Sequence, residues 1–305
     1  MKSSTQNSIS GIYYSLSAGI LWGIVPVYIY FIDVEDPYEI VVHRSIWSAA
    51  FLFLICWIGG QLGDIWAMLK MQRNFCNFFF TACLLSLNWG IYVYSVQTGQ
   101  IVAAALGYFI YPLCTVMLGI IILGETLDRW AGTAIGLVCF GVLVKAMMIM
   151  DIPWVSLALA GTFSLYAVLR KRMGFDPIQG LFVETMLVLP FALAFLIWMA
   201  INGQVLFFGG GLSNLLLAIF AGIITVVPLI FFHRGNQLLS LTMASLLFYS
   251  NPTAQLLLGV IAFSEEFLVN DLIAFGLIWI GIAVYFITRR RVAQRVIAGS
   301  SEHFS

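Results

Sequence analysis

The chain has 305 residues, of which 62% are hydrophobic and only 9% are charged, and its formal net charge at pH 7 is +0. A water-soluble domain carries roughly 25% charged residues, so this chain has too little polar surface to cover itself with water. The composition therefore excludes an ordinary soluble domain and indicates a membrane protein.

Apolar runs of about 20 residues recur along the chain, and each is long enough to cross a bilayer as a helix. The sequence predicts ten such helices, at about 11–32, 38–59, 75–96, 101–123, 129–148, 153–170, 178–200, 212–232, 240–263 and 270–288. Asp-Pro pairs precede the second and seventh runs, where Asp can accept bonds from the free N–H groups of a first turn and proline has no N–H to lose. We therefore expect an all-α polytopic membrane protein with ten transmembrane helices.

The first run indicates a retained helix rather than a signal peptide, because it is a full span without a clear small-residue cleavage pattern. The five cysteines lie in or beside apolar runs and show no metal-ligand spacing. We interpret them as buried small apolar residues and expect neither a metal site nor a cofactor.

Basic residues gather on one side of this topology. If the N-terminus is cytoplasmic and ten helices alternate, twelve of the 14 basic residues are cytoplasmic, Lys145 is outside and Arg44 lies within a helix. The positive-inside rule then predicts a multi-pass protein with both termini in the cytoplasm. The basic run from Arg289 indicates an anchor beside lipid headgroups, and we expect no nucleic-acid partner.

The chain also contains an internal repeat. Residues 106–125 read LGYFIYPLCTVMLGIIILGE and residues 246–265 read LLFYSNPTAQLLLGVIAFSE. A constant offset of 140 residues matches Pro112 with Pro252, Gly119 with Gly259, Glu125 with Glu265, Gly141 with Gly281, and Asp36-Pro37 with Asp176-Pro177. A single offset kept from the second run to the tenth predicts a duplication.

Each copy holds five helices, an odd number, so the second copy enters the membrane from the opposite side. The sequence thus predicts two inverted five-helix repeats, at 11–148 and 149–289, between cytoplasmic tails at 1–10 and 290–305. Inverted repeats recur in secondary transporters, whose binding site lies near the midplane between the halves.

Several motifs, in order, resemble those of a known family. They are EIVVHRSIWS (39–48), NWGIYVYSV (88–96), LGYFIYP (106–112), LGE (123–125), ETMLVLP (184–190) and NPT (251–253). Over about 11–289 the chain resembles the drug/metabolite transporter superfamily with its paired EamA repeats, and most closely its RarD branch. The resemblance implies a ten-helix carrier of the bacterial inner (cytoplasmic) membrane with no ATP-binding part.

The chain departs from that branch at three places. Ala103 stands where RarD-like proteins usually carry Glu, Tyr111 where they often carry Asn, and Phe248 where they usually carry Gln. All three lie on helices expected to face the central cavity, so the resemblance does not carry a substrate with it.

Ionisable residues inside the predicted helices are few. A charge at mid-bilayer costs at least roughly 2.5–3.5 kcal/mol on insertion scales, so such residues normally face a cavity and have partners. Arg44 and Glu184 occupy equivalent places in the two repeats, and we predict that they are partners, directly or through water. Glu39 is the alternative partner. A purely structural role and snorkelling of Arg44 to the outer headgroups also stay open.

Polar and aromatic residues complete the candidate site. The candidates for substrate binding or gating are His43, Arg44, Asn88, Trp89, Tyr92, Tyr108, Tyr111, Glu184, Phe248, Tyr249 and Asn251. An aromatic lining with few polar groups suits a flat or amphipathic organic solute, or a cation. For each aromatic residue, ordinary interior packing or a membrane-interface position is the alternative. Pro112 and Pro252 are the hinge candidates, because a proline within a helix frees a backbone carbonyl.

These observations favour a secondary transporter that moves an amino acid or a drug-like solute by alternating access, with export as the first choice. The alternative is an exchanger or importer of a nucleoside-like metabolite such as S-adenosylmethionine.

An intramembrane enzyme is disfavoured because HExxH and GxSxG motifs are absent, and a pump because there is no GxxxxGK[ST] phosphate loop. The expected partners are a small-molecule substrate and the lipid bilayer. Coupling to protons or to a counter-substrate, a channel function, and the choice between monomer and homodimer stay open.

Overall fold

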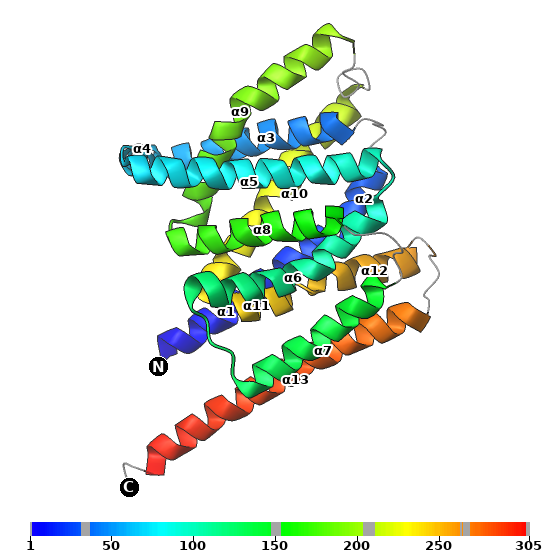
Figure 1. The fold of residues 1–305 in the computed structure, drawn as a ribbon. Coiled ribbons are helices and arrows are strands. Elements are labelled where there is room, and N and C mark those ends of the chain that lie inside the picture. Colours follow the sequence, from blue (N-terminus) through cyan, green and yellow to red (C-terminus); the bar gives the residue numbers. More distant parts are fainter. Residues whose placement is uncertain are drawn as a thin grey trace.

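The computed structural model describes residues 2–31, 37–147, 154–203, 211–262, 264 and 269–302. Every regular element within these ranges is a helix: α1 (Lys2–Gly23), α2 (Val25–Tyr30), α3 (Pro37–Ile58), α4 (Leu62–Leu69), α5 (Gln72–Gln97), α6 (Ile101–Leu123), α7 (Arg129–Ala146), α8 (Trp154–Met173), α9 (Pro177–Ile201), α10 (Gly211–Leu238), α11 (Leu241–Leu247), α12 (Ser250–Ala262) and α13 (Val269–Glu302). Figure 1 shows most of the long helices running between the same two ends of the molecule. The predicted all-α class is confirmed.

Eight segments in the described part of the chain are long and apolar enough to cross a bilayer: Gln6–Tyr28, Tyr38–Ile58, Gln72–Ser95, Ala103–Leu123, Arg129–Ala146, Pro177–Ile201, Gly211–Leu238 and Asp271–Thr288. The two other predicted runs correspond to α8, whose last turn holds Arg170, Lys171 and Arg172, and to the interrupted pair α11 and α12. The chain is a polytopic membrane protein, and the count of ten spans stays a prediction.

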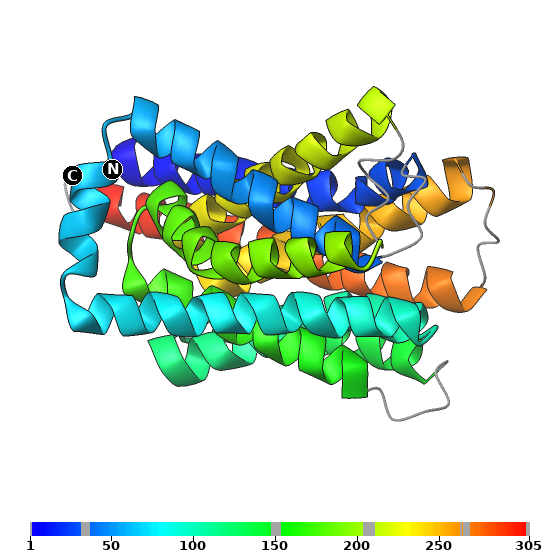
Figure 2. The same ribbon diagram turned by 90° about the horizontal axis from the view of Figure 1, so that it is seen from above.

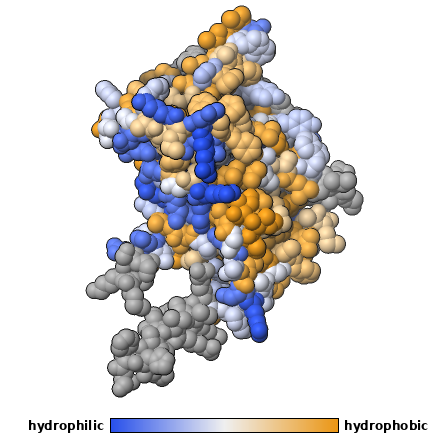
Figure 3. Space-filling view, turned by 60° about the vertical axis from the view of Figure 1, so that its left-hand side comes forward, coloured by the Kyte–Doolittle hydropathy of each residue, from blue (hydrophilic) through white to orange (hydrophobic). Residues whose placement is uncertain are grey.

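The surface carries large apolar side chains. Ile121, Phe191 and Ile201 are 70%, 71% and 79% exposed, and each lies on one of the candidate spans. Figure 3 shows hydrophobic surface over much of one face, with hydrophilic side chains gathered in one area. Contiguous apolar surface of this kind marks a contact with lipid or protein, which agrees with a bilayer as the solvent.

Helix α4 was not among the predicted elements. It follows Gly60, which ends the preceding helix with a φ of 66°, a left-handed conformation that favours glycine. Seen from above, α4 lies at the end of the molecule where α1 begins and α13 ends (Figure 2). The two ends of the described chain therefore lie on the same side of the bundle.

The helix contacts follow the predicted repeat. Helix α7 packs along α13, and α3 packs along α9, so helices at equivalent places in the two predicted repeats are in contact. The contact of α6 with α8 corresponds to that of α12 with α1. The contact of α5 with α8 corresponds to that of α10 with α1. A Cβ atom at Gly141 would lie 2.7 Å from the carbonyl oxygen of Ala274, and one at Gly281 would lie 2.7 Å from that of Ala134. These residues are equivalent at the offset of 140. The contacts support a duplication, while the repeat boundary at 148 and 149 lies outside the described residues.

The two hinge candidates occupy different surroundings. Pro112 lies inside the continuous helix α6. Pro252 is in the first turn of α12, just after the interruption at Phe248 and Tyr249. Their role as hinges stays a prediction.

Candidate functional site

A cavity of about 360 Å³ lies inside the bundle. Its lining comes from helices of both predicted repeats: Trp22, Val25, Pro26, Tyr28, Ile40, Arg44, Asn88, Trp89, Tyr92, Ala104, Ala105, Tyr108, Phe163, Ile224, Leu229, Phe248, Asn251 and Gln255. Residues of α2, the first halves of α3 and α6, and the second half of α5 dominate this set. The cavity therefore occupies the half of the molecule opposite to α4.

Among the described residues that line the cavity, Arg44 is the one that is charged. Its Nε donates a hydrogen bond to Oγ1 of Thr225 over 2.9 Å, and its Cζ lies 5.2 Å from the centre of the Trp89 ring. The positive guanidinium is attracted to the electron-rich face of the indole. No carboxylate in the described part of the chain forms an ion pair with Arg44. Among the described lining residues, the cavity thus has one positive charge and no negative charge.

Seven predicted candidates line this cavity: Arg44, Asn88, Trp89, Tyr92, Tyr108, Phe248 and Asn251. The Asn88 side-chain amide donates to the carbonyl oxygen of Leu159 and to Oγ1 of Thr162, each over 2.9 Å. Gln255, which the sequence did not single out, donates to the side-chain oxygen of Asn251 over 2.8 Å. Most of the predicted cavity lining is therefore brought together.

Aromatic rings close the cavity on its inner side. Trp22 and Phe248 have ring centres 5.5 Å apart, Phe163 and Phe232 5.2 Å, and Tyr111 lies 5.0 Å from both Phe163 and Phe248. Tyr111 was predicted to face the cavity but is only 1% exposed and belongs to this packed cluster. This packed cluster forms the inner wall of the cavity.

Glu184 lies in a buried polar cluster instead of the cavity. Oγ1 of Thr81 donates to its Oε1 over 2.6 Å, and the Tyr166 hydroxyl donates to its Oε2 over 2.9 Å. Nε of Arg170 lies 3.2 Å from Oε1. The predicted pairing of Arg44 with Glu184 is therefore wrong, because Glu184 takes its cation from α8.

Arg170, counted among the cytoplasmic basic residues from the predicted topology, is only 2% exposed. Its guanidinium packs against α9 at Gly180, where an added Cβ atom would lie 2.1 Å from Nη2 and would force the guanidinium to move. Its Cζ lies 5.4 Å from the centre of the Phe78 ring. Its contact with Glu184 is an ion pair without an aligned hydrogen bond from Nε.

Tyr166 connects this cluster to α10, since its hydroxyl oxygen lies 2.9 Å from Nε2 of His233. The single hydroxyl proton is donated to Glu184, so His233 is the donor to Tyr166 in this arrangement. The cluster thus joins α5, α8, α9 and α10. The sequence did not predict this cluster, because its members are far apart along the chain. Only Tyr166 and Arg170 are close in sequence, four residues apart on the same helix face.

Two other candidates also lie outside the cavity lining. His43 is 1% exposed, and its Nε2 lies 3.8 Å from Oε1 of Glu39 on the same helix. The Tyr249 hydroxyl donates to the carbonyl oxygen of Phe109 over 2.8 Å, and this tyrosine is also 1% exposed. Both are packing residues in this conformation.

At the end of the bundle near α4, Glu125 connects the end of α6 to the start of α11. Its carboxylate accepts hydrogen bonds from the backbone N–H groups of Leu241 (2.6 Å) and Thr242 (3.1 Å), at the start of α11. Nζ of Lys171 lies 3.4 Å from the same carboxylate and donates to the carbonyl oxygen of Leu239. Burial raises the pKa of Glu125, but these hydrogen bonds and the charge of Lys171 outweigh it and hold that pKa below its ordinary value. The repeat-equivalent Glu265 lies outside the described residues.

Comparison with known proteins agrees with this architecture. Residues 9–147 match the EamA-like transporter family. Protein RarD of Streptomyces exfoliatus is 32% identical over 286 residues, covering 94% of this chain and 91% of that protein. An uncharacterized transporter of Vibrio cholerae is 33% identical over 288 residues, covering 92% and 93%. A solved structure, described only as the crystal structure of a protein, superposes with a TM-score of 0.70 at 16% identity, covers 96% of this chain and 99% of that chain, and shows the shared fold.

Proposed function

Because the chain belongs to the EamA/RarD-like group of the drug/metabolite transporter superfamily, we propose that it is a secondary transporter of a small organic solute in the bacterial inner membrane. The observation that carries this proposal is the cavity around Arg44, where one cation, without an acidic partner among the described residues, stands among aromatic and amide side chains. Apolar clefts with a few placed polar groups are typical of small-molecule sites.

The chemistry of the cavity favours a substrate with a carboxylate and an apolar or aromatic body. A substrate carboxylate would accept charge-assisted hydrogen bonds from Arg44, which are stronger than those between neutral groups. Trp89, Tyr92 and Tyr108 would pack against the rest of the molecule. Amino acids and drug-like acids have this combination, and we propose their export as the physiological direction.

The two ends of the bundle support transport by alternating access. The cavity lies in one half, while the aromatic cluster and the contact of Glu125 with α11 close the other. Two inverted repeats would provide the mirror-image state, in which the closed and open ends exchange. In the proposed topology, with both termini in the cytoplasm, the half of the bundle that holds the cavity would lie toward the outside.

A nucleoside-like metabolite such as S-adenosylmethionine is the second candidate. The aromatic side chains of Trp89 and Tyr108 offer surfaces on which a flat base would stack, and Arg44 would bind the carboxylate of the amino-acid part. This alternative requires the cavity of about 360 Å³ to widen around a larger solute.

Counterflow in liposomes tests the proposal. Purified protein is reconstituted, loaded with one unlabelled amino acid or drug-like acid, and supplied with the labelled form outside. A carrier shows saturable uptake that internal substrate stimulates, and Arg44→Gln shifts this uptake to higher substrate concentrations while Arg129→Gln, at the exposed start of α7, does not. Uptake that neither saturates nor responds to internal substrate would indicate a channel, and formation of a new product would indicate an enzyme.

A further inference from the structure

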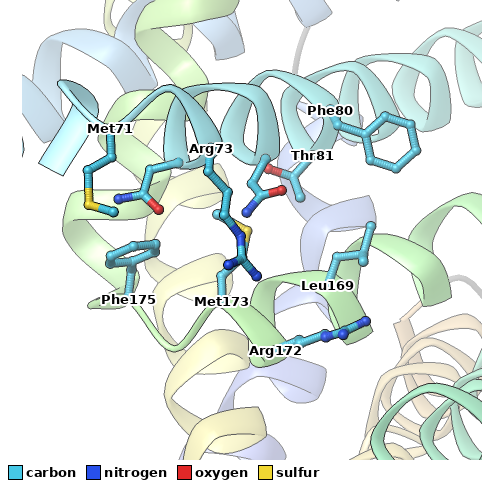
Figure 4. Close-up of a pocket in the computed structure, with 10 residues that line it drawn as sticks. Met71, Arg73, Phe80, Thr81, Leu169, Arg172, Met173 and Phe175 are labelled. Atoms are coloured by element: carbon cyan, nitrogen blue, oxygen red, sulfur yellow. The ribbon is translucent and has the colours of Figure 1, made fainter.

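A second pocket, of about 470 Å³, lies between the start of α5 and the end of α8. It shares no lining residue with the cavity around Arg44. Figure 4 shows Arg73 extending from α5 into the space between the two helices, with Arg172 on the α8 side. The pocket is therefore a separate site at the end of the bundle that carries α4.

The two arginines of this pocket lack acidic partners. Both are exposed, and neither forms an ion pair with a carboxylate of the residues that the structure describes. Two neighbouring basic residues at the same end are compensated: Lys171 contacts Glu125, and Nη2 of Arg234 lies 2.8 Å from Oδ2 of Asp176. Arg73 and Arg172 thus bring to this pocket two positive charges that no described carboxylate neutralises.

Two amides line the same pocket from within a candidate membrane span. Asn74 and Asn77 belong to the first two turns of the segment Gln72–Ser95. Asn74 donates to the carbonyl oxygen of Met68 over 3.0 Å, whereas Asn77 is exposed and forms no hydrogen bond with another residue of the described ranges. A polar group at this depth is costly unless a polar partner meets it. The pocket therefore offers both charge and hydrogen-bonding capacity to a ligand.

The pocket changes from polar to apolar along α5. Phe80, which is 52% exposed, lies seven residues beyond Arg73, or about 10 Å along the helix axis. Leu169 faces the same apolar part from α8. A free inorganic anion would use only the arginine end, whereas a phospholipid would place its phosphate beside the arginines and its upper acyl chains beside Phe80 and Leu169.

We propose that this pocket binds the headgroup of an anionic phospholipid, with Arg73 and Arg172 on the phosphate and Asn77 donating to a headgroup oxygen. Basic pockets between helices on the cytoplasmic side suit such headgroups. Helices α5 and α8 belong to different predicted repeats, so the lipid would bridge the two halves of the protein. Thr81, at the inner end of the pocket, donates to Glu184, which places the lipid beside the buried cluster.

Native mass spectrometry of the delipidated full chain in mild detergent tests the proposal without a transport assay. The protein is titrated with phosphatidylglycerol, phosphatidylcholine or inorganic phosphate. We expect R73Q/R172Q to weaken phosphatidylglycerol binding by about tenfold or more, because each basic residue near the headgroup contributes to the attraction. K70Q removes an exposed charge at the same end that does not line the pocket, and it should change the affinity less than about twofold.

Three outcomes would overturn the proposal. The first is that K70Q and R73Q/R172Q lose phosphatidylglycerol binding equally. The second is that the wild type shows no preference for phosphatidylglycerol over phosphatidylcholine. The third is that phosphate displaces the lipid at equal concentration, which would indicate a free-anion site. The charge-retaining variant R73K/R172K controls for folding. It should keep the preference for the anionic lipid and the thermal stability of the wild type.

Discussion

Positions 44 and 184 are equivalent in the two repeats, yet the molecule uses them in opposite ways. Arg44 lies at a cavity wall with one hydrogen bond to Thr225 and an indole face as its neighbours. Glu184 is 1% exposed and has contacts from Thr81, Tyr166 and Arg170. The first charge is available to a ligand, and the second is already compensated by the protein.

This difference shows that positions matched by the offset of 140 residues can have unrelated roles, because the local partners decide what each residue does. A charge whose partners are complete contributes to stability and has little to offer a substrate. A charge with incomplete partners contributes to binding, because a ligand supplies what the protein does not. The following predictions test this contrast, from the largest expected effect to the smallest.

Glu184→Leu should destabilise the protein by about 3–5 kcal/mol, because it leaves Arg170 buried without its counter-charge. The double variant Glu184→Leu with Arg170→Met should recover much of this loss, since an apolar pair can replace a buried ion pair. Thermal unfolding in detergent, followed by size-exclusion chromatography, measures the effect. If Arg44→Leu, instead of Arg170→Met, recovered the stability that Glu184→Leu loses, Glu184 would pair with Arg44, which the structure contradicts.

Arg44→Gln should leave the folded yield close to that of the wild type but should raise the KM of transport by at least about tenfold. Truncating the partner of a desolvated ligand charge typically costs about 2–5 kcal/mol of binding. Counterflow over a range of substrate concentrations separates KM from the maximal rate. A variant that loses folded protein and transport together would show that Arg44 is mainly structural.

Glu125→Gln should weaken the closed end of the bundle by about 1.5–3 kcal/mol, because hydrogen bonds from α11 to a charged carboxylate become bonds to a neutral amide. The pKa of Glu125 is lower in the folded protein than its ordinary value. Its contribution is therefore present above the ordinary carboxyl pKa and is lost as the pH falls through the folded pKa.

Thiol labelling of a cysteine introduced at Leu241 reports this opening, in a background without the five native cysteines. Labelling is expressed relative to that of the denatured protein at the same pH, which corrects for the titration of the thiol itself. This relative labelling should rise in acid when Glu125 is present. In the Glu125→Gln variant it should be high and independent of pH, because the carboxylate at this contact is gone. A rise in acid that survives the substitution would assign the effect to another group.

Thr225→Val should have the smallest effect, about 1 kcal/mol on substrate affinity, because it removes the acceptor that orients Nε of Arg44 and keeps the side-chain volume. Stability should change little, since Arg44 lies at the cavity and water can satisfy Nε. Thr242→Val is a poor control because it touches Glu125. Thr133→Val, on the exposed face of α7, is the matched control and should leave transport unchanged.

Local pattern determined a large part of this protein. Hydropathy and length predicted the all-α membrane class, because a helix that crosses lipid must be apolar over its whole length. The offset of 140 residues predicted which helices are equivalent, and seven of the candidates named from the sequence line the cavity. These properties are encoded by neighbouring residues or by direct sequence identity.

Only the tertiary structure decided how the buried charges are paired. Symmetry suggested Arg44 and Glu184, but the distance between two side chains depends on helix rotation and tilt, which hydropathy does not specify. Arg170 was counted with the cytoplasmic basic residues, and only the tertiary structure shows that its side chain packs against Gly180 and pairs with Glu184. Tyr111 was placed in the cavity for the same reason, since the sequence shows that a residue is on an inner face but not whether a neighbouring ring covers it.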